Sequence, residues 1–201
     1  GYLYTDSHAG WFRDSTHAIT AGPFDYESPW AVFLSPRGDR TLASSVSSQP
    51  LVPVIDAATG GTAYELAGTK SLSVAAFSPD GAILYAAASG RPLADDSLRS
   101  FDASTGAALL ATGVPGGNGV LGMTTSSDGS RLYLMQLRGG RCAPRLLVVE
   151  TATLALAGAA AVPEPVAGLV CGAVGFHAPL VVDEAAGKLW MTWPGEPFPV
   201  F

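Results

Sequence analysis

Residues 74–89 read VAAFSPDGAILYAAAS, and residues 97–113 read SLRSFDASTGAALLATG. In the first stretch, the Ser-Pro-Asp-Gly segment at 78–81 separates two apolar runs. Proline presets φ in such a turn, aspartate bonds its own backbone, and glycine accepts a positive φ. The two stretches therefore predict an antiparallel meander of four short strands, at 72–77, 82–86, 97–102 and 107–111.

The same turn recurs along the chain at a regular interval. The copies are LSPRG at 34–38, FSPDG at 77–81, TSSDG at 125–129 and a degenerate DEAAG at 183–187. A second motif recurs at a similar interval. Its copies are IDAATG at 55–60, FDASTG at 101–106 and VETAT at 149–153, with a degenerate copy, FRDST, at 12–16. Intervals of roughly 40 to 50 residues match the size of a four-stranded propeller blade.

The phase of the repeat predicts incomplete blades at both ends. With the strands of a blade labelled a to d from the inside outward, whole blades are expected at 31–66, 72–112 and 119–158. Residues 1–22 read as strands b, c and d of a first blade, and 178–201 as strands a and b of a last one. We therefore expect an all-β propeller domain with about four blades' worth of strands. The ring either closes by itself, belongs to a larger propeller, or is completed by another chain.

These motifs resemble the YVTN-type repeat of bacterial β-propellers, a relative of the WD40 and pyrroloquinoline-quinone repeats. In that repeat a Ser-Pro-Asp-Gly turn, a Leu-Tyr-Val strand and an Asp-x-x-Thr-Gly turn follow one another, and the resemblance covers about residues 31–157. The Gly-His and Trp-Asp dipeptides of WD40 repeats are absent. The tryptophan that ends the quinone-docking repeat is absent too, with Leu66 and Ala111 near its place. Neither of those activities is transferred to this chain.

The amino-acid composition argues against nucleic acid as a partner and against a membrane span. The chain of 201 residues is 48% hydrophobic and only 14% charged, with a net charge of −6 and a pI near 4.9. Nucleic-acid binding needs clustered lysine and arginine, so it is not expected. No apolar run approaches the ~20 residues of a membrane span. We expect no cofactor and no metal site.

Cys142 and Cys171 are the only cysteines. They form one disulfide or are two unrelated buried thiols, and the Gly/Arg/Pro-rich loop around Cys142 favours the disulfide. YVTN-like propellers are often exported, so the resemblance implies an extracellular or periplasmic protein. No leader is recognisable before the first predicted strand, and any preceding segment is expected to have been removed or to lie outside this sequence.

The sequence contains no convincing catalytic or cofactor-binding motif. GNGVLG at 117–122 fits the dinucleotide pattern literally, but it lies between two predicted strands, with no helix to present to a phosphate. The sequence has no nucleophile elbow, Walker loop or zinc-binding His-Glu-x-x-His segment. His8, His17 and His177 lack a second ligand at metal spacing and read as loop histidines.

In a propeller, the loops that join strand d to the next strand a, and strand b to strand c, gather on one face. We call this the loop face. Long loops on a rigid array are where binding residues concentrate. The candidate binding residues on this face are His8, Asp25, Glu27, Trp30, Arg91, Asp95, Asp96, Arg141, His177 and Trp193.

Two functions from different classes remain. The first is a non-catalytic scaffold that binds a protein or glycan partner through the loop face. The second is a propeller enzyme, such as a metal-dependent lactonase or a dehydrogenase large subunit, with its site in the central channel. An enzyme needs acids, bases or ligands from several blades at the axis. The inner-strand positions 32–33, 74–76 and 121–123 carry small or apolar residues instead, which favours binding, and we identify no catalytic residue.

Overall fold

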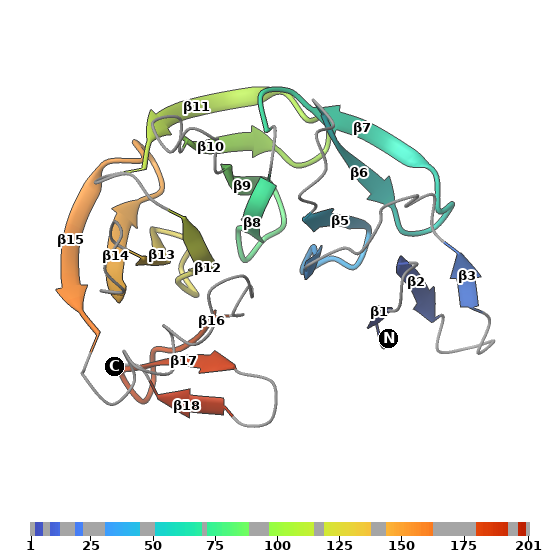
Figure 1. The fold of residues 1–201 in the computed structure, drawn as a ribbon. Helices are drawn as coiled ribbons and strands as arrows, with labels where there is room; N and C mark the ends of the chain where they lie inside the picture. Colours follow the sequence, from blue (N-terminus) through green and yellow to red (C-terminus); the bar gives the residue numbers. More distant parts are fainter. Residues whose placement is uncertain are drawn as a thin grey trace.

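The computed structural model describes residues 3–5, 9–12, 19–21, 31–44, 51–69, 72–88, 97–114, 119–137, 144–162, 180–192 and 197–199. Every regular element in these ranges is a β-strand, and the strands form five antiparallel sheets, here numbered I to V in chain order. Figure 1 shows the sheets arranged as an arc around a common centre. In these ranges, no helix has the length and hydrophobicity needed to cross a bilayer.

Sheets II, III and IV each have four strands in simple chain order. Sheet II comprises β4 (Ala31–Leu34), β5 (Arg40–Ser44), β6 (Val52–Asp56) and β7 (Thr62–Leu66). Sheet III comprises β8 (Leu72–Phe77), β9 (Ile83–Ala88), β10 (Ser97–Asp102) and β11 (Ala108–Gly113). Sheet IV comprises β12 (Val120–Thr125), β13 (Arg131–Leu137), β14 (Pro144–Glu150) and β15 (Leu156–Ala161). These are the four-stranded meanders that the repeat predicts.

The sheets at the two ends of the arc have three strands each. Sheet I comprises β1 (Leu3–Thr5), β2 (Ala9–Phe12) and β3 (Ile19–Ala21). Sheet V comprises β16 (Leu180–Asp183), β17 (Lys188–Thr192) and β18 (Pro197–Pro199). The sequence pattern gave only two strands to the last blade. It missed β18 because this edge strand contains two prolines, which are depleted in strands.

The first strand of each sheet from II to V lies on the inside of the arc, and the last strands β7, β11 and β15 lie on the outside (Figure 1). The inner strands contact one another in chain order, β4 with β8, β8 with β12, and β12 with β16. This radial stacking of four-stranded meanders is a β-propeller architecture, so the predicted fold class is confirmed.

The hydrophobic core lies between consecutive sheets. One cluster joins sheets II and III around Leu42 and Phe101, both fully buried. A second joins sheets III and IV around Leu98 and Leu147, and a third joins sheets IV and V around Met135. Because sheets III and IV each pack one face on the sheet before and the other on the sheet after, both faces of their central strands are apolar.

The recurring turns hold the meanders together. In sheet III, the Ser78 hydroxyl donates to Asp80 Oδ1 at 2.6 Å, and Asp80 Oδ1 accepts from the Ala82 amide at 3.0 Å. Gly81 closes the turn at φ +68°. Sheet II has Arg37 where the turns of sheets III and IV have Asp80 and Asp128, and its Ser35 hydroxyl instead donates to Asp39 Oδ1 at 2.6 Å. A carboxylate two positions further along the chain therefore preserves the turn.

Candidate functional site

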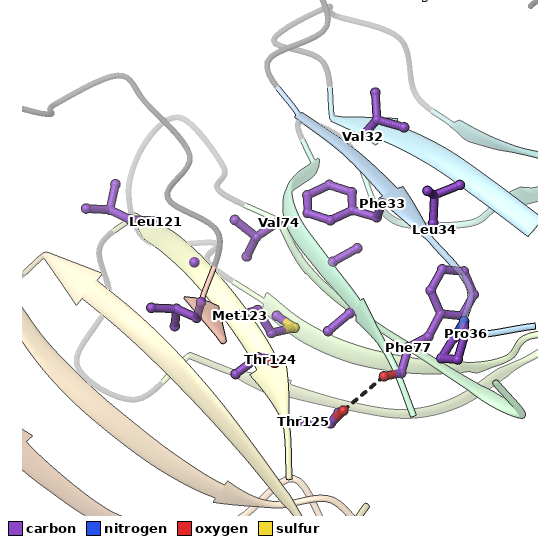
Figure 2. Close-up of a pocket in the computed structure, with 14 residues that line it drawn as sticks. Val32, Phe33, Leu34, Pro36, Val74, Phe77, Leu121, Met123, Thr124 and Thr125 are labelled. Atoms are coloured by element: carbon purple, nitrogen blue, oxygen red, sulfur yellow. Dashed lines mark hydrogen bonds between the residues drawn. The ribbon is translucent and has the colours of Figure 1, made fainter. Parts of the chain in front are cut away.

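The inner strands line a partly open cavity of about 290 Å³ on the inside of the arc. Figure 2 shows the fourteen residues that line it. They come from β4, β8 and β12, with Pro36 from the turn after β4 and Leu180 from β16. Four successive sheets thus contribute to one concave wall in the channel of the propeller.

This wall is apolar because the same strand positions carry the same kind of residue in each repeat. Val74, Ala75, Leu121 and Met123 are buried, whereas Leu34 is 50% exposed. Local register shifts occur between Leu72 and Val74 and between Val120 and Gly122, at the start of the wall. Such a bulge re-aims the residues that follow it. Some side chains of the wall are therefore buried in the hydrophobic core, and others are exposed to the channel.

Two threonines are the only polar side chains among the lining residues. The Thr125 hydroxyl donates to the Phe77 carbonyl oxygen at 3.0 Å, drawn as a dashed line in Figure 2, and so links β12 to the neighbouring sheet. Thr124 precedes it on the same strand and is half-buried. None of the fourteen lining residues is ionisable. Among the described residues, no group of three or more His, Cys, Asp or Glu side chains is placed to hold a metal ion.

The sheets are also joined at the turns after their inner strands. Arg37 Nε donates to the Asp80 carbonyl oxygen at 2.6 Å, from sheet II to sheet III. The Ser127 amide of sheet IV donates to Glu184 Oε1 of sheet V at 3.1 Å. These turns lie at the edge of each sheet opposite the loop face, because the strands alternate in direction. We call this edge the turn face.

Hydrogen bonds in the turns keep several carboxylates ionised. The Ser126 hydroxyl, followed by the amide and hydroxyl of Ser130, lowers the pKa of Asp128 to about 2. The hydroxyls of Ser104 and Thr105, followed by their amides, lower the pKa of Asp102 to about 2 in the same way. A carboxylate that accepts several hydrogen bonds favours its charged form. The turn face therefore stays negatively charged at these positions throughout the physiological range.

The outer strand of sheet II makes one well-defined contact with the next sheet. The Tyr64 hydroxyl donates to the Ala103 carbonyl oxygen at 2.6 Å. Burial raises the pKa of Tyr64 to about 12. The equivalent positions in the next two sheets are Leu110 and Gly158, neither of which can make this hydrogen bond.

The ten loop-face residues proposed from the sequence all lie outside the described residues, as do Cys142 and Cys171. The described strand ends do locate two of the loops. Ala88 pairs with Ser97 at the base of the loop with Arg91, Asp95 and Asp96. Leu137 pairs with Pro144 at the base of the loop that carries Arg141. Both loops therefore leave from the edge opposite the turn face.

Sequence reasoning identified part of the channel wall and missed the rest. It named positions 32–33, 74–76 and 121–123, all of which line the cavity. It did not include Leu34, Phe77, Thr124 or Thr125, which continue the same strands toward the turn face. The repeat pattern could have identified these four residues, because they occupy the positions that follow the predicted ones in each repeat. How far the cavity extends along each strand is decided by the stacking of the sheets.

Comparisons with known proteins support the fold and do not extend to activity. No family model matches the chain, and no curated protein matches its sequence. A solved structure of Kuenenia stuttgartiensis hydrazine synthase is similar to it, with a TM-score of 0.62 and 20% identity over 90% of this chain. The chain spans only 45% of that protein chain. The likeness is one of fold. At 20% identity it carries no information about activity.

Proposed function

We propose that this protein is a non-catalytic propeller scaffold of the YVTN type that binds a protein or glycan partner through its loop face. The observation that carries the proposal is the composition of the channel wall. Where a propeller enzyme needs acids, bases or metal ligands from several blades, the described lining residues are aliphatic side chains, two phenylalanines, one methionine, one proline, one glycine and two threonines. Chemistry-bearing side chains are concentrated in the loops instead.

The asymmetry between the two edges of the sheets supports the loop face as the binding surface. At the turn face, short hydrogen-bonded turns such as 78–82 and 103–107 join the strands. At the opposite edge, the connections at 89–96 and 163–179 are longer and contain charged residues or histidine. A rigid stack of sheets with long, side-chain-rich connections on one edge is suited to display a recognition surface.

The strands that complete the propeller ring are treated as part of the same proposal, as one kind of partner. Sheets I and V have three strands each, so further strands or blades from another chain, or from a longer chain, would complete the ring. Export to the extracellular space or periplasm, with a disulfide between Cys142 and Cys171, is consistent with this role. The mass of the intact protein under non-reducing and reducing conditions, with thiol alkylation, tests the disulfide directly.

The test of the proposed function is a binding assay with paired variants. The immobilised chain is probed with a glycan array and with secreted proteins of its source, and any ligand found is then titrated. The double variant Arg91→Ala/Arg141→Ala should weaken binding at least tenfold, since it removes loop-face charges. Glu65→Ala on the exposed outer strand β7 is the matched control and should have no effect. Equal binding by wild type and the double variant, or loss only in the control, would overturn the loop-face assignment.

A further inference from the structure

We propose that the channel cavity is a binding site for a small, uncharged, largely apolar molecule about the size of two aromatic rings. The site is separate from the loop face and does not depend on the function proposed above. Three properties of the wall, namely its volume, its polarity and its uncovered apolar side chains, lead to this ligand class.

The volume sets the size of the ligand. An engineered apolar cavity of about 150 Å³ binds benzene and stays dry when empty. The channel cavity measures about 290 Å³, so it has room for a molecule of about two rings, or for a branched aliphatic molecule of similar bulk. It lies at the lower end of the range of about 300–1,000 Å³ that is typical of ligand pockets.

The polarity of the wall excludes charge. None of the described lining residues is ionisable, and an ion moved to such a surface loses its hydration without a partner. The Thr125 hydroxyl already donates its hydrogen bond to the Phe77 carbonyl oxygen. Thr124 is the remaining hydroxyl of the wall, so the ligand that fits best carries at most one polar group.

The inner strands also have apolar side chains that the fold leaves uncovered. Leu34 on β4, which lines the cavity, is 50% exposed. Phe33 and Val32 are half-buried on the same wall. Most other core side chains of these sheets pack between neighbouring sheets. An apolar ligand in the channel would cover the uncovered side chains and gain the transfer free energy that the fold leaves unused.

The experiment uses two related fluorescent probes. N-phenyl-1-naphthylamine is uncharged and has linked aromatic rings, and 1-anilinonaphthalene-8-sulfonate adds only a sulfonate. The purified chain should bind the uncharged probe saturably at one site, with enhanced and blue-shifted emission. It should bind the sulfonate at least tenfold more weakly. Absence of saturable binding, or equal affinity for the two probes, would overturn the proposal.

Two variants locate the probe. Ala76→Leu fills the cavity from β8 and should weaken binding of the uncharged probe at least tenfold. Ala111→Leu adds the same side chain to the exposed outer strand β11 and should leave binding unchanged. Thr124→Leu fills the cavity from β12. It should weaken binding of the uncharged probe in the same way, and it replaces Ala76→Leu in the test if Ala76→Leu fails to fold. Loss that is equal in the cavity and outer-strand variants, or absent in both cavity variants, would place the probe outside the channel.

Discussion

Strands β8 and β11 are the inner and outer strands of one sheet, and their sequences are similarly apolar. Strand β8 reads LSVAAF and is buried at every position but Ala76, whereas β11 reads ALLATG and is exposed at every position but Thr112. Strands β12 and β15 of sheet IV repeat the contrast. The sheets converge at the inner strands and diverge at the outer ones. Local hydrophobicity therefore does not decide burial in this fold, and radial position does.

The largest expected effect comes from matched truncations on these two strands. Leu72→Ala on β8 removes a side chain that is 2% exposed and should cost about 2–5 kcal/mol in free energy of unfolding. Leu110→Ala on β11 removes one that is 39% exposed and should change it by no more than about 0.5 kcal/mol. Urea unfolding followed by tryptophan fluorescence measures both. A large loss for Leu110→Ala would mean that the outer strand is covered in solution.

A second pair tests where an outer strand does contact its neighbour. Gly60 and Gly106 close equivalent turns at φ +71° and +74°. A Cβ on Gly60 meets nothing within 4 Å, whereas a Cβ on Gly106 would overlap the ring of Tyr64. Gly60→Ala should cost about 1–2 kcal/mol for the positive φ alone. Gly106→Ala should cost about 1–3 kcal/mol more, from overpacking.

The same unfolding assay compares the two glycine variants. Since both variants carry the backbone strain, their difference isolates the contact with Tyr64. Equal costs would show that the Tyr64 ring moves aside freely and that the outer strands of sheets II and III are equally unconstrained.

Tyr64→Phe removes the hydrogen bond from the outer strand β7 to the Ala103 carbonyl oxygen of the next sheet. It should lower stability at neutral pH by about 0.5–1.5 kcal/mol. Burial raises the pKa of Tyr64 to about 12, above its usual value of 10.0. The stability that this residue contributes is therefore complete below pH 10 and is lost as pH rises toward 12. Thermal melts from pH 8 to 12 should show a shallower alkaline loss for Tyr64→Phe, and a profile parallel to wild type would contradict the burial of this hydroxyl.

The smallest effect concerns the turn that leads to the outer strand β11. The pKa of Asp102 is lowered from 3.8 to about 2, chiefly by the Ser104 and Thr105 hydroxyls. A lowered pKa in the folded state contributes stability that is present above pH 4 and is lost as pH falls toward 2. Asp102→Asn should be slightly less stable at pH 7 and should lose less stability on acidification. Circular-dichroism melts between pH 2 and 7 measure this, with Glu65→Gln on β7 as the control.

Much of the fold was accessible from local patterns. The strands predicted at 72–77 and 97–102 coincide with β8 and β10. Turn chemistry and alternation are local, so a repeat of them specifies a sheet wherever it occurs. The extent of the channel wall was less accessible. Phe77 and Thr125 occupy equivalent positions of successive repeats, 48 residues apart, but only the stacking of the two sheets brings the Thr125 hydroxyl to the Phe77 carbonyl oxygen.

The sequence by itself determined the repeating unit, its four short strands and the turns that join them, because each depends on residues that are neighbours in the chain. The tertiary structure decided which of two equally apolar strands is buried and which side chains of four inner strands line one cavity. It also placed the Tyr64 hydroxyl within hydrogen-bond distance of the next sheet. These properties depend on how successive sheets converge toward the centre of the arc. A single repeat, read in isolation, carries no information about its neighbour's position.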